Sequence, residues 1–268
     1  MLLDYHIHTD LCRHAQGAPD NYVKTAIKRG LGEIGFSDHC PWPAGFDMKS
    51  RMAISDFPQY KKILSGLREK FPSLPIKYGL EVDWVPGRMD EVWDSLDKEE
   101  FDYLIGSIHH VGDFPFDNPE RLKEWSKKET ADTVWQKYFE TMKDIILSGK
   151  LDILGHFDIP KKFGIYPKCY DKLLKNEIPE LLKLAGTRNM AIEINTSGLR
   201  KPVGEIYPSP EILRMARESG LLLTLGSDSH HPDEPGKDFD KALELAKFAG
   251  YKEVCSFNKR IPSPHKLG

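Results

Sequence analysis

Short apolar runs alternate with amphipathic helical patterns along almost the whole chain. The apolar runs have the length of buried strands, and the segments between them repeat apolar residues at the spacing of one helix face. The expected strands are residues 2–10, 33–37, 76–82, 102–108, 151–154, 190–194, 221–225 and 254–257. The expected helices are residues 20–29, 56–70, 89–96, 119–147, 170–185, 210–219 and 238–249. This alternation predicts an α/β fold in which crossover helices connect the strands of a parallel sheet.

No internal repeat, low-complexity tract or linker interrupts the alternation. We therefore expect residues 1–268 to form one domain, a closed or nearly closed TIM-like (β/α) barrel with seven or eight units. The active site of such a barrel lies at the carboxyl ends of its strands. Residues that follow the expected strands are therefore the first candidates for function.

The composition is that of an ordinary globular protein, with 40% hydrophobic and 29% charged residues and a formal net charge of -3. This charge argues against a surface that binds nucleic acid or an anionic membrane through bulk electrostatics. No apolar run approaches the roughly 18 residues of a membrane-spanning helix, and the first expected strand leaves no room for a signal peptide. The four cysteines form no C-x-x-C pair, which favours reduced thiols in a cytoplasmic protein.

The first expected strand carries two histidines, His6 and His8, separated by Ile7. Side chains alternate between the two faces of a strand, so both imidazoles should point the same way while Ile7 points to the other face. Neutral imidazole is the most common protein ligand for divalent transition metals. On its own this pair is equally compatible with two polar residues at the end of a strand.

Later strands also end in residues that commonly bind metals. This regularity favours a metal site over two ordinary polar residues at the end of one strand. These strand-end residues are His6, His8, His39, Glu81, His109, His156, Asn195, Asp228 and His230, and His14 lies in the first loop. A single ion cannot use so many ligands, whereas two or three divalent ions sharing carboxylates could. Glu81 lies among apolar residues and is a natural bridge, although it could also be a strand-end residue that faces water.

Three other histidines are expected to play no part in this centre. His110 should face the side opposite to His109, although the residues by themselves do not decide which of the two belongs to the centre. His231 precedes Pro232, and His265 lies in a polar C-terminal tail.

The candidate ligands lie in short sequence motifs spread along the chain. The motifs are His6-Ile7-His8-Thr9, Cys12-Arg13-His14-Ala15, Ser37-Asp38-His39, Gly79-Leu80-Glu81, Gly106-Ser107-Ile108-His109, Gly155-His156-Phe157-Asp158 and Gly226-Ser227-Asp228-Ser229-His230. As a set they resemble the polymerase-and-histidinol-phosphatase (PHP) superfamily. Three further stretches resemble its stand-alone histidinol-phosphate phosphatases in particular: Ser50-Arg51-Met52, Phe114-Pro115-Phe116-Asp117 and Glu193-Ile194-Asn195-Thr196-Ser197-Gly198-Leu199-Arg200.

This resemblance implies a distorted barrel and a phosphatase that converts L-histidinol phosphate to L-histidinol in histidine biosynthesis. It implies two or three divalent ions, with Zn, Mn, Fe and Co all compatible with nitrogen-rich ligands. The implied metal ligands are His6, His8, His14, His39, Glu81, His109, His156, Asp228 and His230.

We expect a hydroxide that bridges two metals to attack phosphorus in line. Asp228, His230 and His8 are the candidate catalytic residues, and Asp228 would orient or deprotonate the attacking water. The candidate substrate-binding residues are Arg200, Lys161, Asn195 and Arg51. The sequence does not decide between Lys161 and Lys162 as a phosphate contact, and Arg200 could instead be a solvated loop charge.

Three other functions compete with this one. A nuclease or nucleotide phosphoesterase of the same superfamily would need an extended basic track, but the segment containing Trp42, Phe46 and Arg51 suggests a lid over a small substrate. An amidohydrolase would use fewer ligands, and a non-catalytic metal-binding barrel would usually have lost some. The expected partner is a small phosphomonoester, with no nucleic acid or membrane; the chain could also form a homo-oligomer.

Overall fold

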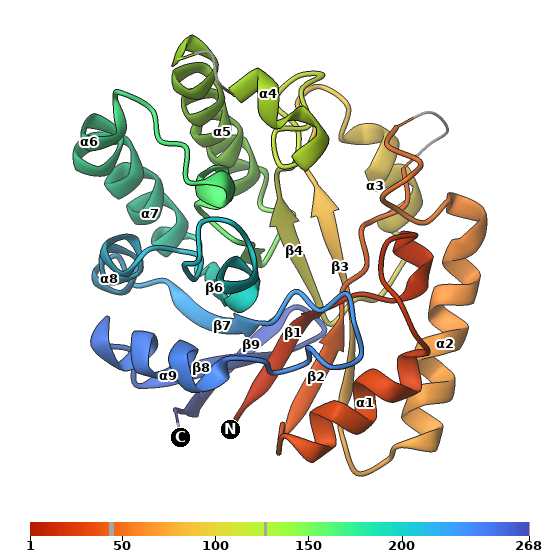
Figure 1. Ribbon diagram of the computed structural model, residues 1–268. Coiled ribbons are helices and arrows are strands. Elements are labelled where there is room, and N and C mark those ends of the chain that lie inside the picture. The colour runs from red at the N-terminus through yellow and green to blue at the C-terminus, as the bar shows by residue number, and fades with distance from the viewer. Residues whose placement is uncertain (43–45, 126–127, 268) are drawn as a thin grey trace.

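One parallel sheet forms the centre of the described part of the molecule, and each of its strands pairs with the next strand along the chain (Figure 1). The computed structural model describes residues 1–42, 46–125 and 128–267. Within those residues the sheet has seven strands. They are β1 (Leu3–Ile7), β2 (Glu33–Phe36), β3 (Ile76–Asp83), β4 (Tyr103–Ser107), β5 (Ile153–Leu154), β6 (Ala191–Asn195) and β7 (Leu222–Gly226).

The sheet closes on itself where β1 ends. The backbone N–H of His8 donates to the carbonyl of Ser229, and the N–H of Ser229 donates to the carbonyl of His6, both at 3.0 Å. Ser229 lies just beyond β7, so the first and last strands of the sheet meet at their carboxyl ends. The predicted barrel is confirmed, with seven units in its wall.

Helices surround the sheet, as expected from crossover connections (Figure 1). They are α1 (Pro19–Lys28), α2 (Phe57–Lys70), α3 (Asp90–Leu96), α4 (Leu122–Trp125), α5 (Lys128–Ser148), α6 (Tyr170–Lys172), α7 (Ile178–Thr187), α8 (Pro210–Glu218) and α9 (Phe239–Phe248). Residues 126 and 127 of the helix expected over 119–147 lie outside the described residues, as do residues 43–45 of the lid segment. None of the described helices combines the length and hydrophobicity needed to cross a membrane.

Short 3-10 turns and one π-helical turn complete the connections. They are η1 (Asp10–Cys12), η2 (Ile54–Asp56), η3 (Pro119–Arg121), η4 (Ile159–Phe163), η5 (Leu173–Glu177) and η6 (Thr196–Arg200), of which η5 is π-helical. Three of them, η1, η4 and η6, follow the carboxyl ends of strands β1, β5 and β6.

The interior of the barrel is filled by aromatic side chains that require small neighbours. The buried ring of Tyr103 occupies space next to Gly35 and Gly79, where a Cβ atom on either glycine would overlap it. Its hydroxyl donates to the carbonyl of Tyr5 at 2.7 Å, and the two tyrosine rings stack with centroids 4.5 Å apart. This packing fills the interior of the barrel, and it does not involve the residues at the carboxyl ends of the strands.

The expected strand at 254–257 exists, but it belongs to a separate antiparallel hairpin. Strand β8 (Glu253–Asn258) pairs with β9 (Ile261–Lys266), and the guanidinium of Arg260 at the turn contacts Asp152, which directly precedes β5. The prediction of a polar C-terminal tail was wrong. The prolines at positions 262 and 264 argued against a strand, because proline is confined to the edges of sheets. β9 is such an edge strand, since it pairs only with β8 in a two-stranded sheet.

Candidate metal centre

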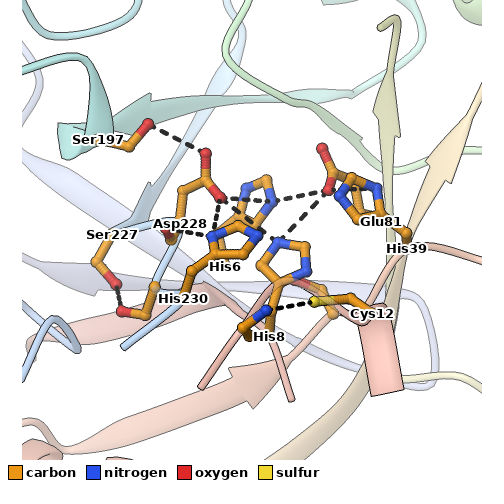
Figure 2. Close-up of polar contacts among 12 residues, drawn as sticks. His6, His8, Cys12, His39, Glu81, Ser197, Ser227, Asp228 and His230 are labelled. Carbon is orange, nitrogen blue, oxygen red and sulfur yellow. Dashed lines mark hydrogen bonds and ion pairs between the residues drawn. The ribbon is translucent and has the colours of Figure 1, made fainter. Parts of the chain in front are cut away.

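The carboxyl ends of the strands bring together all nine ligand-type residues proposed from the sequence (Figure 2 labels several of them). His6 lies on β1 and Glu81 on β3. His14 lies beyond the turn η1, and the other six follow β1, β2, β4, β5 and β7 within a few residues. The rings of His6 and His8 lie 5.2 Å apart, as two residues on one face of a strand should. Parallel strands whose ends meet at one rim therefore convert a scattered sequence pattern into one cluster.

Glu81 is the residue around which the imidazoles gather. Its Oε2 lies 3.1 Å from Nδ1 of His39 and 3.3 Å from Nε2 of His6. Its Oε1 lies 2.9 Å from Nε2 of His156 and 3.5 Å from Nε2 of His109. The two oxygens of one carboxylate thus face two different groups of histidines, so Glu81 would be able to contribute an oxygen to a cation held by either group.

Asp228 forms a second anionic focus in the cluster. Its Oδ1 lies 3.5 Å from Nε2 of His8 and 3.8 Å from Nε2 of His6, and its Oδ2 accepts a hydrogen bond from Oγ of Ser197 at 3.0 Å (Figure 2). The ring of His230 stacks on that of His8 with centroids 4.1 Å apart. His14 joins the cluster from the other side of His230, at 4.5 Å between ring centroids.

Two of these residues have a left-handed backbone, with φ of 51° at Asp228 and 20° at His156. Residues other than glycine rarely adopt such angles, and the surrounding structure must hold them there. Both residues follow short strands, β7 and β5, and the sharp turn directs their side chains back into the rim.

Three further carboxylates contact ring nitrogens of the clustered histidines. No role was expected for them from the sequence. Glu193 contacts Nδ1 of His6 at 2.7 Å, and Asp83 contacts Nδ1 of both His39 and His109. Such partners fix the orientation and tautomer of a metal-binding histidine.

The third carboxylate, Asp38, accepts a hydrogen bond from the backbone of Thr9 at 2.6 Å and lies 3.6 Å from Nδ1 of His8. A signal for two of the three carboxylates was present in the sequence. Asp83 follows Glu81 by two residues on one strand, and Glu193 interrupts an otherwise apolar run.

The carboxylates and imidazoles shift one another's pKa values strongly. Burial would raise the pKa of Glu81, but the surrounding histidines, led by His39 and His6, hold it well below its usual range. Burial would lower the pKa of His6, but Glu193, Glu81 and Asp228 raise it well above the usual value. The centre therefore favours positive charge beside ionised carboxylates.

Three other imidazoles of the centre have pKa values shifted in opposite directions. Burial opposes a charge on His109, yet Asp83 and Glu81 raise its pKa to about 9. Burial and the neighbouring His8 instead lower the pKa of His230 and of His14. A lowered pKa keeps these two rings neutral, which is the form of histidine that binds metals.

The donor set fits divalent cations. Buried nitrogen atoms that face the cluster, namely Nε2 of His6, His8 and His230, find no hydrogen-bond partner among the described residues. A buried polar atom without a partner costs free energy, and a coordinated cation would remove that cost. Imidazole nitrogens with carboxylate oxygens suit Zn, Mn, Fe or Co.

A cavity of about 600 Å³ opens onto the cluster. Its wall includes Arg200 and Arg51, two of the four substrate-binding candidates. Nε of Arg200 lies 2.9 Å from Oε1 of Glu234, while its buried Nη1 has no hydrogen-bond partner within the described ranges. Arg51 is buried and bound to Asp83 at 2.7 Å, so its first effect is to hold the carboxylate behind His39 and His109.

The described part of the expected lid, the segment that contains Trp42, Phe46 and Arg51, lies at this wall. Phe46 packs on the buried ring of Trp42, with centroids 4.6 Å apart, and the guanidinium of Arg51 lies over the Phe46 ring. Asp47 and Ser50 line the cavity beside Arg51. The described part of the segment thus forms one side of the cavity.

The other two candidates, Lys161 and Asn195, lie outside the cavity wall. The buried ammonium of Lys161 contacts Asp158 at 3.0 Å and the carbonyl of Ile206 at 2.9 Å. The buried amide of Asn195 donates to Glu193 at 3.0 Å and accepts from the backbone of Ser197 at 2.9 Å. Both residues fix the loop after β6, and neither is placed to contact a substrate in the cavity.

Two other lysines, Lys162 and Lys201, line the cavity together with His110. Which of the neighbouring lysines 161 and 162 can contact phosphate depends on which side chain of η4 faces the cavity. The sequence alone does not show this. His110 was expected to face away from His109. That expectation was wrong, because β4 ends at Ser107 and the alternation of a strand no longer applies.

The fold and the centre define a class of protein: a parallel barrel whose rim carries histidines and carboxylates arranged for several divalent cations. A family model described as "PHP domain" matches residues 4–197. The chain belongs to the PHP domain family. This match confirms the resemblance seen in the motifs.

The similarity extends over the full length of individual relatives. The chain is 36% identical over 262 residues to a probable histidinol-phosphatase of Deinococcus radiodurans, covering 97% of this chain and 98% of that protein. It is similar to the crystal structure of histidinol phosphate phosphatase from Lactococcus lactis complexed with zinc, L-histidinol and phosphate, with a TM-score of 0.83, 25% identity and 98% coverage of both chains. A putative histidinol phosphatase structure from Listeria monocytogenes gives a TM-score of 0.80 at 26% identity, covering 89% of this chain and 99% of that one.

Proposed function

We propose that this chain is a metal-dependent phosphatase that hydrolyses L-histidinol phosphate to L-histidinol and phosphate, a step of histidine biosynthesis. It is a phosphoric monoester hydrolase of the PHP family. Whole-length similarity to histidinol-phosphatases supports this substrate, as does the solved relative whose crystals contain zinc, L-histidinol and phosphate.

The main structural support for this substrate is that the cavity wall contains both basic and acidic side chains. Arg200 and Lys201 place positive charge in this wall, and the carboxylates of Asp47 and Asp117, each shared with a basic neighbour, lie in the same wall. A substrate that combines a phosphate dianion with an ammonium group matches both kinds of residue. A nucleic acid would require a continuous basic surface instead.

Two or three divalent ions would be held by the nine residues around Glu81 and Asp228. When bound, such ions lower the pKa of coordinated water and neutralise phosphoryl oxygens. Glu81 presents one oxygen to each group of histidines, and Glu193 and Asp83 keep the imidazoles in place. The chain contributes a ligand set whose imidazoles are already oriented by neighbouring carboxylates.

Asp228 is the proposed general base of the reaction. Its pKa is held well below the usual range, since His6 and His8 outweigh the effect of burial. The carboxylate is therefore ionised, and the hydrogen bond from Ser197 fixes its orientation. His8 and His230 lie against it and complete the proposed catalytic group.

Arg200 is the proposed arginine contact to phosphate. Its Nε and Nη2 atoms are occupied by Glu234 and the carbonyl of Ser227, which leaves the Nη1 group for a ligand.

An activity comparison tests the proposed function. Purified protein loaded separately with Zn, Mn, Fe or Co is assayed on L-histidinol phosphate and on a 3′-phosphorylated nucleotide. We expect hydrolysis of L-histidinol phosphate to have the higher kcat/KM. Preference for the nucleotide would favour a nucleotide phosphoesterase, and no phosphatase activity with any metal would favour a non-catalytic metal-binding barrel.

A further inference from the structure

The cavity wall contains four basic side chains besides its histidines: Arg51, Lys162, Arg200 and Lys201. Three of them are already neutralised by a carboxylate. Arg51 is bound to Asp83 and Asp47, Lys162 lies 3.3 Å from Oδ2 of Asp117, and Arg200 lies 2.9 Å from Glu234. An ion pair reduces the positive charge that such a side chain can offer to an incoming anion.

Lys201 differs from the other three. Its ammonium forms no hydrogen bond or ion pair with any residue in the described ranges. Burial is the main cause that lowers its pKa, and the nearby charges of Lys162 and Arg200 lower it further against the opposing effect of Asp228. Partial burial of a cation without an ion-pair partner costs free energy, and an anionic ligand in the cavity would offset that cost.

The backbone around Lys201 is held firmly. The N–H of Lys201 donates to the carbonyl of Gly198 at 3.1 Å, and its own carbonyl accepts from Gly204 at 2.9 Å. Val203 donates to the carbonyl of Lys162 at 3.0 Å, which connects this loop to the turn η4 across the cavity wall. Lys201 is therefore presented to the cavity from a fixed position.

We propose that Lys201 is a substrate-binding residue whose ammonium contacts the phosphoryl group. This assignment rests on the proposed function, since it names the residue that supplies the free positive charge of that site. A lysine ammonium acts on phosphate as a compact point charge with three donors, and it needs no particular plane of approach. The paired cations, Arg51 and Lys162, chiefly shape the wall and orient the carboxylates.

The test compares Lys201→Met with Lys201→Arg in the metal-loaded, full-length protein. Lys247→Met is the matched control, because it removes the same charge from an exposed position on α9, outside the cavity wall. We expect Lys201→Met to raise KM for L-histidinol phosphate about ten- to a hundred-fold, the range for loss of one charge-assisted hydrogen bond. Inhibition by inorganic phosphate should weaken by a similar factor, and inhibition by L-histidinol should not change.

Lys201→Arg should restore most of the phosphate affinity, and Lys247→Met should behave as wild type. Metal content and the melting temperature should stay at the wild-type level in all three variants. The proposal is overturned if Lys201→Met binds phosphate as tightly as Lys247→Met does, if it loses metal, or if Lys201→Arg is as impaired as Lys201→Met.

Calorimetric titration of metal-loaded protein with inorganic phosphate separates this proposal from the proposed function. If the wild type fails to hydrolyse L-histidinol phosphate, the substrate assignment fails. Weaker phosphate binding by Lys201→Met in the titration would still support the role of Lys201, and equal binding would overturn it.

Discussion

Oε1 of Glu193 lies 2.7 Å from Nδ1 of His6, and both side chains are buried. The same carboxylate accepts hydrogen bonds from the backbone N–H of His156 at 2.9 Å and from the amide of Asn195 at 3.0 Å. With its Nδ1 held in this way, His6 turns Nε2 towards Glu81 and Asp228. One carboxylate on β6 thus holds the imidazole of His6 on β1 and the backbone of His156 just after β5.

Replacing Glu193 should therefore weaken the centre without touching a proposed ligand. We expect Glu193→Gln to weaken metal affinity about ten- to a hundred-fold, as is typical for residues that orient metal-binding histidines. Metal titration followed by calorimetry measures the change. Glu211→Gln, on the exposed surface of α8, is the control, and equal metal affinity in both variants would show that Glu193 does not position His6.

A substitution at Gly226 provides a second test of the contact between Glu193 and His6. A Cβ atom at this position would overlap Oε1 of Glu193 and lie 2.7 Å from Cβ of His6. We expect Gly226→Ala to lose metal affinity and to lower the free energy of unfolding by about 1–3 kcal/mol, because overpacked cores must shift.

Gly66→Ala in α2 provides the matched control, since a Cβ atom there meets nothing within 4 Å. Its stability should stay the same or rise by up to about 1 kcal/mol, because alanine favours a helix over glycine. Denaturant unfolding of both variants measures the difference. Comparable behaviour of the two would mean that Glu193 can move without consequence.

Removing the metals should abolish activity but not the fold. The aromatic core around Tyr103 is independent of the rim, unlike the core of a zinc finger, which forms only with its metal. We expect chelation to eliminate hydrolysis while far-UV circular dichroism is largely retained, and added metal should restore the activity. Global unfolding on chelation would assign the metals a structural role.

Histidines inside and outside the centre should respond differently to alanine. His39→Ala and His230→Ala should lower kcat by orders of magnitude, because each removes a proposed ligand. His265→Ala should leave kcat unchanged and cost about 1 kcal/mol of stability, because His265 contacts Oγ of Ser256 at 2.7 Å within the hairpin. Steady-state assays and thermal melts distinguish the two effects, and similar kcat losses in all three variants would contradict the proposed centre.

Arg200→Ala should lower kcat/KM about ten- to a hundred-fold, the effect of losing one charge-assisted hydrogen bond. A rise in KM would indicate contact with phosphate in the ground state, and a fall in kcat would indicate contact mainly in the transition state. Metal content should not change. Arg214→Ala on α8 is the control, and if its kcat/KM matched that of Arg200→Ala, Arg200 would serve only to hold Glu234 and the Ser227 carbonyl.

The sequence alone determined the barrel and the members of the cluster. Strand and helix periods are local properties, so the alternation of the two predicted the parallel sheet. Parallel strands end at one rim, so residues as distant as His6 and Asp228 could be placed together without any knowledge of distances. The histidine pair at positions 6 and 8 followed from the two-residue period of a strand.

Only the tertiary structure decided which charges are free and which are occupied. Lys161 and Lys162 are neighbours in the sequence, yet one is buried against Asp158 and the other faces the cavity, because the turn of η4 separates them. The roles proposed for Glu193 and Lys201 rest in the same way on tertiary structure: Glu193 contacts His6 from another strand, and Lys201 has no ion-pair partner among the described residues. Pairing between distant side chains leaves no periodic trace in a single sequence, and for that reason it appears only when the chain is folded.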